Sequence, residues 1–166
     1  TDGTEFDQYP RAVAKKTVEY LQKEGIADDA KVLVELEFHV FDTVKYSTDF
    51  SHSFYEVQSS EGIGPDFEDD PRFQIQKGYH RLYPADKSFN LRNDIVAALE
   101  SAGIPVKYHH HEVSAAQLEI ELDFISLSEA GDKVSLAKWI AVNIARKHGV
   151  FITFMPKPVY NIAGNG

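Results

Sequence analysis

The stretch KVLVELEFHVF, residues 31–41, decides the fold. Apolar side chains occupy every second position from Val32 to Val40, which is the period of a β-strand that buries one face. The opposite face carries Leu33, Glu35, Glu37, His39 and Phe41. Three polar side chains between two apolar ones indicate either a solvent-exposed face of an amphipathic strand or a pocket in an otherwise apolar surface.

Helices and further strands alternate along the chain around this strand. Pro10 and Gly25 are typical of the start and the end of a helix, and Ser88 can cap a second one. A third helix is expected to begin at Asp132 and to bury a stripe of side chains around Trp139. That stripe consists of Leu136, Ile140 and Ile144. The expected helices cover 10–24, 88–103 and 132–148, and the expected strands cover 31–41, 104–113, 117–126 and 150–155.

The region between the first strand and the second helix has a different composition. Residues 42–76 are rich in Ser, Asp and Gly, and the acidic run 66–70 lies between Pro65 and Pro71. Such a composition predicts a long solvated loop with one or two short strands.

The composition favours a single globular domain and excludes several classes of function. The 166 residues carry 17 basic and 26 acidic side chains, a formal charge of −9. The sequence contains no cluster of Lys and Arg that could bind a phosphate backbone, so nucleic acid is not expected as a partner. Hydrophobic residues make up 43% of the chain, which excludes intrinsic disorder. The absence of Cys excludes disulfides, zinc ribbons and thiol nucleophiles.

These features indicate a soluble, cytoplasmic protein. Zero Cys is typical of a reducing compartment, and no run approaches the roughly 18 apolar residues of a membrane span. The first residues are unlike a signal peptide. Because the chain starts with Thr1 and its only Met is Met155, we expect it to be a segment of a larger protein.

Carboxylates on three expected strands are the candidates for chemistry. They are Glu35, Glu37, Glu112 and Glu119. Placing them in one cleft without a cation would cost several kcal/mol in repulsion and desolvation. Oxygen ligands with at most an occasional imidazole favour Mg²⁺ or Mn²⁺ over zinc or copper. The His triplet 109–111 is by itself more typical of packing and hydrogen bonding than of metal ligands. For Glu121 and Asp123 we expect an outward, solvated face.

The order of several motifs resembles the catalytic domain of glutamine synthetase, most closely type I. The matching stretches are VELEF (34–38), HHHEV (109–113), QLEI (117–120), FMPKP (154–158) and AGNG (163–166). The resemblance covers nearly the whole chain. It implies an α+β fold, with a curved, mainly antiparallel sheet and helices on its outer face. It also implies that 1–166 is part of that catalytic domain, without its N-terminal domain and its C-terminal half.

The resemblance implies two divalent metal ions, Mg²⁺ or Mn²⁺. Glu37, Glu112 and Glu119 would bind the first ion, on the glutamate side of the reaction. Glu35 would be one ligand of the second, on the phosphates of the nucleotide.

The resemblance also implies roles in catalysis and substrate binding. Tyr79 would lie at the ammonium site and would act there with Glu112. Phe124 and Lys107 would lie on the nucleotide side. The loop residues in the site of the substrate glutamate would be Gly164 and Gly166.

The implied reaction is an ATP-dependent ligation. The γ-carboxylate of glutamate is phosphorylated by ATP, and ammonia then attacks the γ-glutamyl phosphate to give glutamine. The implied partners are therefore glutamate, ammonia and ATP, and the parent protein would form a homo-oligomeric ring with shared active sites. Because much of such a site lies outside residues 1–166, we expect these residues alone to be inactive.

Several positions depart from the family pattern. Lys107 stands where the family usually has an acidic residue, and Ala116 replaces a usual Gly. Ala163 and Asn165 stand where Asn and Ser are common. Two alternatives therefore stay open. One is a γ-glutamyl-amine ligase of the same family, and the other is a non-catalytic relative used for binding or assembly.

Overall fold

A four-stranded antiparallel sheet with the order β5-β6-β2-β8 lies at the centre of the molecule. The structure, a computed structural model, describes residues 3–64 and 76–166. The strands of the central sheet are β2 (Glu35–Phe41), β5 (Val106–His111), β6 (Gln117–Leu122) and β8 (Phe151–Thr153). This sheet and three helices confirm the predicted α+β fold.

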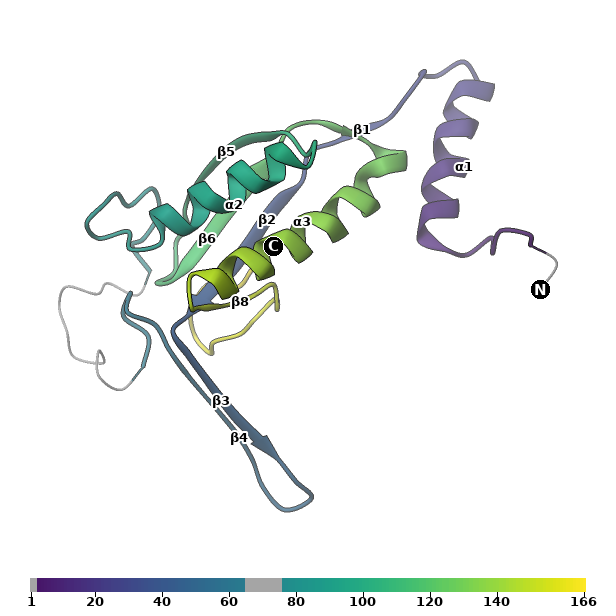
Figure 1. Ribbon diagram of the computed structural model, residues 1–166. Coiled ribbons are helices and arrows are strands. Elements are labelled where there is room, and N and C mark those ends of the chain that lie inside the picture. Colours follow the sequence, from purple (N-terminus) through teal and green to yellow (C-terminus); the bar gives the residue numbers. More distant parts are fainter. Residues whose placement is uncertain (1–2, 65–75) are drawn as a thin grey trace.

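Two helices, α2 (Phe89–Ser101) and α3 (Leu127–Lys147), pack side by side against one face of the sheet (Figure 1). The alternating apolar side chains of β2 and β6 point toward these helices. The core includes Leu36, Phe38, Val40, Leu118, Ile120 and Leu122 from the sheet and Leu91, Ile95, Leu99 and Ile140 from the helices. A fully buried side chain of this kind stabilises the fold by about 1.5–3 kcal/mol. The same burial leaves the other face of the sheet to the polar side chains.

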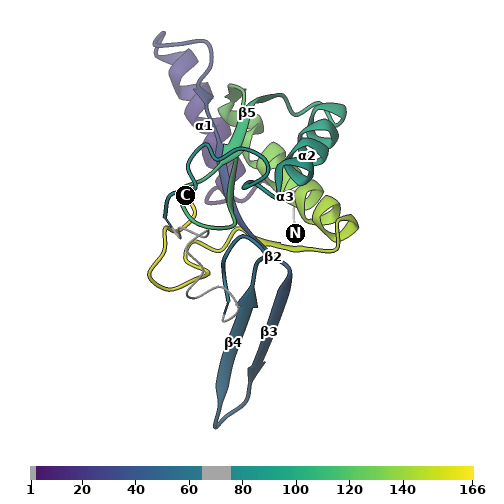
Figure 2. The ribbon, with the colours of Figure 1, turned by 90° about the vertical axis from the view of Figure 1, so that its left-hand side faces the viewer.

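The C-terminal segment lies on that polar side. Figure 2 shows the C-terminus on the side of the sheet away from α2 and α3. The last residues of the chain therefore lie over the polar face that β2 and β6 present.

The helix α1 (Pro10–Lys23) packs against α3 instead of the sheet. Arg11 in its first turn forms an ion pair with Asp132 of α3. The chain then forms β1 (Lys31–Val32), which pairs with β7 (Ile125–Ser126) in a separate two-stranded sheet. The strand expected over 31–41 is thus divided into β1 and β2.

A hairpin of β3 (Thr43–Thr48) and β4 (Ser53–Gln58) extends away from the central sheet (Figure 1). The prediction for this region was a long loop with one or two short strands, and the described part contains two paired ones. The acidic run 66–70 lies outside the described residues.

The helix α3 differs from its prediction in two respects. It begins at Leu127, five residues before Asp132, with Ser126 as its N-cap residue. The expected buried stripe is confirmed at Ile140 and Ile144. It is wrong at Leu136 and Trp139, which are 42% and 64% exposed. The helix instead turns small side chains, Ala137, Ala141 and Ala145, to the core beside Ile140. Among the described residues, no helix is long and apolar enough to cross a membrane.

Candidate metal site on the polar face of the sheet

Strand register brings the carboxylates of β2 and β6 together. In this antiparallel pair, Glu37 lies opposite Glu119, and Glu35 lies opposite Glu121. Directly opposed residues on one face have Cβ atoms about 4.5–5.5 Å apart. The two strands therefore present a block of four carboxylates on the face that the helices leave free.

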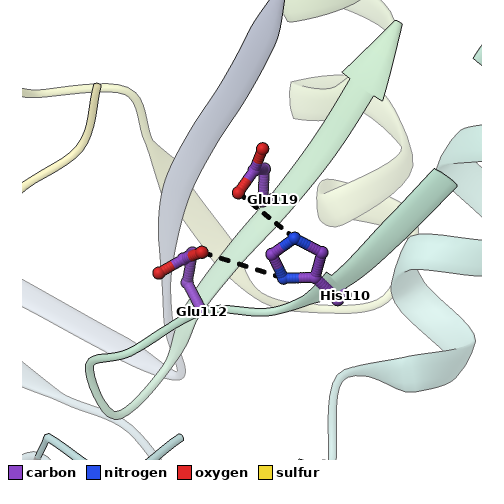
Figure 3. A group of neighbouring side chains, drawn as sticks. All are labelled: His110, Glu112 and Glu119. Atoms are coloured by element: carbon purple, nitrogen blue, oxygen red, sulfur yellow. Dashed lines mark ion pairs between the residues drawn. The ribbon is translucent and has the colours of Figure 1, made fainter. Parts of the chain in front are cut away.

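The edge strand β5 adds an imidazole to this block. His110 lies opposite Glu119 in the β5–β6 pairing, and its Nε2 is 3.3 Å from Glu119 Oε2. Its Nδ1 is 3.8 Å from Oε1 of Glu112, which follows the end of β5 (Figure 3). These three residues offer one ligand atom each within 4.8 Å of one another. Glu112 and Glu119 are both buried.

Glu119 shows what this crowding does to a carboxylate in the absence of a cation. Burial, which is the largest cause, and the neighbouring Glu112, Glu35 and Glu37 together raise its pKa to about 8. A divalent cation removes this conflict because it compensates the negative charge of the ligands. The donor set of carboxylate oxygens with one imidazole suits Mg²⁺ or Mn²⁺. The residues present therefore fit the ions that the sequence predicts.

Glu121 corrects a prediction. We expected it on an outward, solvated face, but 1% of it is exposed and it lies beside Glu35 and Glu119. Burial raises the pKa of Glu121, but hydrogen bonds from Lys107 and Tyr108 outweigh this effect and lower it overall. Glu121 is therefore a fifth carboxylate of the site, and it is ionised at pH 7. Its place on the face of Glu119 follows from the period of the strand, but its burial depends on the pairing of β6 with β2 and β5.

Lys107 reaches Glu121 because β5 is irregular at this point. The register shifts between Val106 and Tyr108, so that Lys107 is an extra residue on this strand. Its Nζ lies 2.7 Å from Glu121 Oε1 and 5.2 Å from the centre of the Tyr108 ring. The nucleotide-side role of Lys107 stays a prediction. Within the described residues, its side chain is an ion-pair partner inside the carboxylate block.

The predicted ammonium-site residue lies next to the imidazole of the cluster. The ring of Tyr79 stacks on His80 at 4.3 Å and meets the edge of His110 at 5.1 Å between ring centres. Both Tyr79 and the predicted nucleotide neighbour Phe124 are more than half exposed. Phe124 lies between β6 and β7, beyond the carboxylate block.

The loop predicted to hold the substrate contacts a predicted metal ligand directly. The backbone N–H of Gly166 donates a hydrogen bond of 2.7 Å to Glu37 Oε2. The side-chain amide of Gln117 donates to the same oxygen and to the carbonyl of Gly164. A Cβ at Gly164 would lie 2.3 Å from the carbonyl oxygen of Pro156, so this position accepts only glycine. The loop and Glu37 are thus held in one arrangement.

His39 supports this loop and does not belong to the cluster of ligands. It is fully buried, and its Nδ1–H donates a 2.9 Å hydrogen bond to Asn165 Oδ1. Burial lowers its pKa to about 4, so the ring is neutral at pH 7. The amide of Asn165 also donates to the carbonyl of Met155 at 2.8 Å. The pocket that the sequence indicated around His39 is filled by the loop.

Ala116, in the turn before β6, stands where the family usually has Gly, and its backbone conformation is strained. Ala116 is fully buried and has a φ of 58°. This left-handed conformation is easy for glycine and costs roughly 1–2 kcal/mol for other residues. The turn still brings the carbonyl of Ala116 to the N–H of Val40 at 2.8 Å.

Sequence reasoning missed a buried contact behind Glu112. His111 is fully buried, with Nδ1 2.7 Å from the carbonyl oxygen of Glu112 and Nε2 2.8 Å from Glu61 Oε2. Glu61 also accepts hydrogen bonds from the backbone of Lys87 and Ser88. Nothing near Glu61 in the sequence indicates this contact, because its partners lie at least 26 residues away.

Comparison with known proteins agrees with this geometry. Residues 7–166 match the family model described as "Glutamine synthetase, catalytic domain". The chain is 40% identical to a glutamine synthetase from Streptomyces coelicolor over 169 residues and 37% identical to one from Azospirillum brasilense over 170. Each alignment covers 99% of this chain and 36% of the relative.

A solved structure shows the same fold. The cryo-EM structure of Plasmodium falciparum glutamine synthetase matches with a TM-score of 0.86 at 33% identity, over 99% of this chain and 34% of that one. The chain therefore spans about a third of the length of the relatives that it matches.

Proposed function

The chain belongs to the family of glutamine synthetase catalytic domains, and from this premise we propose that it forms the metal-binding part of an ATP-dependent glutamate–ammonia ligase. One observation carries the proposal. Carboxylates from β2, β6 and the end of β5 gather with His110 on the single face of the sheet that the helices leave open. We infer that further sequence and neighbouring subunits of a ring complete this site.

The proposed reaction has two steps. The γ-carboxylate of glutamate attacks the γ-phosphorus of ATP, so that ADP leaves and γ-glutamyl phosphate forms. Ammonia then attacks the acyl carbon, phosphate leaves, and the amide nitrogen loses a proton. Two bound Mg²⁺ or Mn²⁺ ions would supply charge stabilisation for the transferring phosphoryl group.

The side chains of this chain have separate tasks in that scheme. Glu37, Glu112 and Glu119 would hold the first ion, and Glu35 would be a ligand of the second. Gly166 and Gln117 fix the position of Glu37 by donating hydrogen bonds to its Oε2. Pre-organisation of this kind matters because a ligand that is already in place loses little conformational entropy when the ion binds.

The acceptor amine would be bound near Tyr79. Anionic side chains around His110 attract an ammonium ion, and a carboxylate of this group can accept the proton that the amine releases. Tyr79 lies at the edge of His110, and His110 in turn pairs with Glu112 and Glu119. This chain of contacts supports the proposal that Tyr79 and Glu112 act at the ammonium site.

A cavity next to Tyr79 favours a larger amine as a second candidate acceptor. Its volume is about 390 Å³, and aromatic and imidazole rings from Tyr79, Phe89, Tyr108 and His110 line it. A single water takes roughly 30 Å³ in the liquid, and ammonia is of similar size. The space would accept an organic amine, as in a γ-glutamyl-amine ligase.

The test is an amide-formation assay on a polypeptide that contains these residues together with the rest of the catalytic domain. ATP, Mg²⁺ and glutamate are supplied with ammonia, methylamine or ethylamine, and residues 1–166 alone are the control that is expected to be inactive. We expect glutamine from ammonia and no turnover after metal removal with EDTA. Product from the alkylamines only would identify the amine ligase. Absence of product with every acceptor would contradict the ligase and favour a non-catalytic relative.

A further inference from the structure

An ammonium group already lies among the carboxylates on the side of Glu35. Lys107 Nζ is 2.7 Å from Oε1 of Glu121, and Glu121 is directly opposite Glu35 in the pairing of β2 and β6. Carboxylate oxygens of Glu35, Glu119 and Glu121 lie within 4.8 Å of one another. The Lys107 ammonium is therefore a tethered cation beside a set of three oxygen donors.

The two partners of this ion pair differ in mobility. The Glu121 side chain is 1% exposed and is held between neighbouring strands, whereas the Lys107 side chain is 43% exposed. A long, partly exposed lysine side chain can move into solvent at small cost, but the buried carboxylate cannot follow it. A stronger cation that arrived at Glu121 would therefore displace Lys107.

We propose that Glu121 is a further ligand of the second divalent ion, on the side of Glu35, and that Lys107 competes with this ion for the Glu121 carboxylate. The inference rests on the proposed metal-dependent function. It assigns a role to two residues of this chain. Glu121 binds the second ion, and competition from the Lys107 ammonium limits the affinity of the site for that ion.

The charges give the direction of each effect. Glu35, Glu119 and Glu121 together bring up to three negative charges, and Lys107 cancels one of them. Removal of the ammonium exposes a free carboxylate oxygen and increases the local negative charge, so a divalent ion should bind more tightly. Replacement of Glu121 by Gln removes a charged donor, so the same ion should bind more weakly. Close, buried charges act strongly enough for changes of at least about tenfold.

The experiment is a titration of the 166-residue chain with Mn²⁺, in which electron paramagnetic resonance measures the free ion. The variants are Lys107→Met, Glu121→Gln and Lys107→Arg, and circular dichroism records the thermal midpoint of each. Lys45→Met is the matched control, because Lys45 forms a similar pair with Glu56 at 2.8 Å on the exposed hairpin.

We expect two classes of Mn²⁺ site in the wild-type chain. The weaker class should tighten at least about tenfold in Lys107→Met, weaken at least about tenfold in Glu121→Gln, and stay unchanged in Lys107→Arg and Lys45→Met. If Glu121→Gln does not fold, the Mn²⁺ affinity of Lys107→Met tests the proposal alone. The Lys107 side chain is partly exposed, so this variant is expected to fold.

Wild-type affinities in both Lys107→Met and Glu121→Gln would overturn the inference and leave the pair as a structural salt bridge, with the proposed function intact. A wild-type chain that binds no Mn²⁺ at all would overturn the inference, whereas the proposed function is decided separately by the amide-formation assay on the longer polypeptide.

Discussion

Glu37→Gln is expected to lower ATP-dependent amide formation at least about 100-fold in a polypeptide that carries the complete catalytic domain. The amide has nearly the same shape as the carboxylate and keeps an oxygen that can accept the hydrogen bond from Gly166. It removes a negative charge, and a divalent ion binds a neutral amide oxygen much more weakly than a carboxylate. The loss should therefore appear in turnover and in Mn²⁺ affinity, while the thermal midpoint stays close to that of the wild type.

Glu56→Gln is the matched control for this substitution. Glu56 is partly exposed on the hairpin, where it pairs with Lys45, far along the chain from the carboxylate block. Its variant should retain the wild-type rate and the wild-type Mn²⁺ affinity. A Glu37→Gln protein with more than a third of the wild-type activity would contradict the assignment of Glu37 as a metal ligand.

Asp86→Ala is expected to lower the free energy of unfolding by about 3–5 kcal/mol. Asp86 and Arg92 form a two-pronged ion pair, with distances of 2.6 and 3.1 Å, and their side chains are 1% and 3% exposed. Arg92 also donates from Nε to Nδ1 of His109 at 3.2 Å and so connects α2 to β5. Removal of the carboxylate would leave a guanidinium charge buried without its counter-ion.

Urea denaturation of the chain, followed by circular dichroism, measures this effect. Glu129→Ala is the control, because Glu129 pairs with Lys133 at 2.9 Å on the exposed surface of α3. Exposed pairs of this kind contribute about 0–1 kcal/mol. A cost below 1 kcal/mol for Asp86→Ala would show that this buried pair does not hold α2 on the sheet.

The sequence predicts the strands of the site well because their burial is one-sided. The alternation in 31–41 identifies β2 and its polar face without knowledge of any partner strand. The division between β1 and β2 at residues 33–34 could not be predicted, because the alternation continues through it. The division depends on the partner strands, because β1 pairs with β7 whereas β2 pairs with β6.

Glu121 shows why the composition of a face does not reveal its surroundings. The period of two places Glu119 and Glu121 on one side of β6, but a row of charges there is equally typical of a solvated face. The decisive facts are the register against Glu35 and the irregularity of β5 that brings Lys107 across. Both depend on pairing between segments that are distant in the sequence.

The helix α3 and the contact of Glu61 with His111 show the same limit. A stripe of large apolar residues around Trp139 is a sound helical pattern, yet the close approach of α3 to the sheet selects the alanines for the core. Glu61 lies in a turn with no periodicity at all. Its function as a buried partner of His111 depends entirely on tertiary packing.

The proposed function requires that this polar face binds divalent cations. Anomalous diffraction at the manganese edge, from crystals grown with Mn²⁺ of a polypeptide that carries the complete catalytic domain, tests that claim most directly. The account predicts an anomalous peak in contact with the carboxylates of Glu37, Glu112 and Glu119. A map with no peak at these residues, at Mn²⁺ concentrations that place ions elsewhere on the protein, would contradict it.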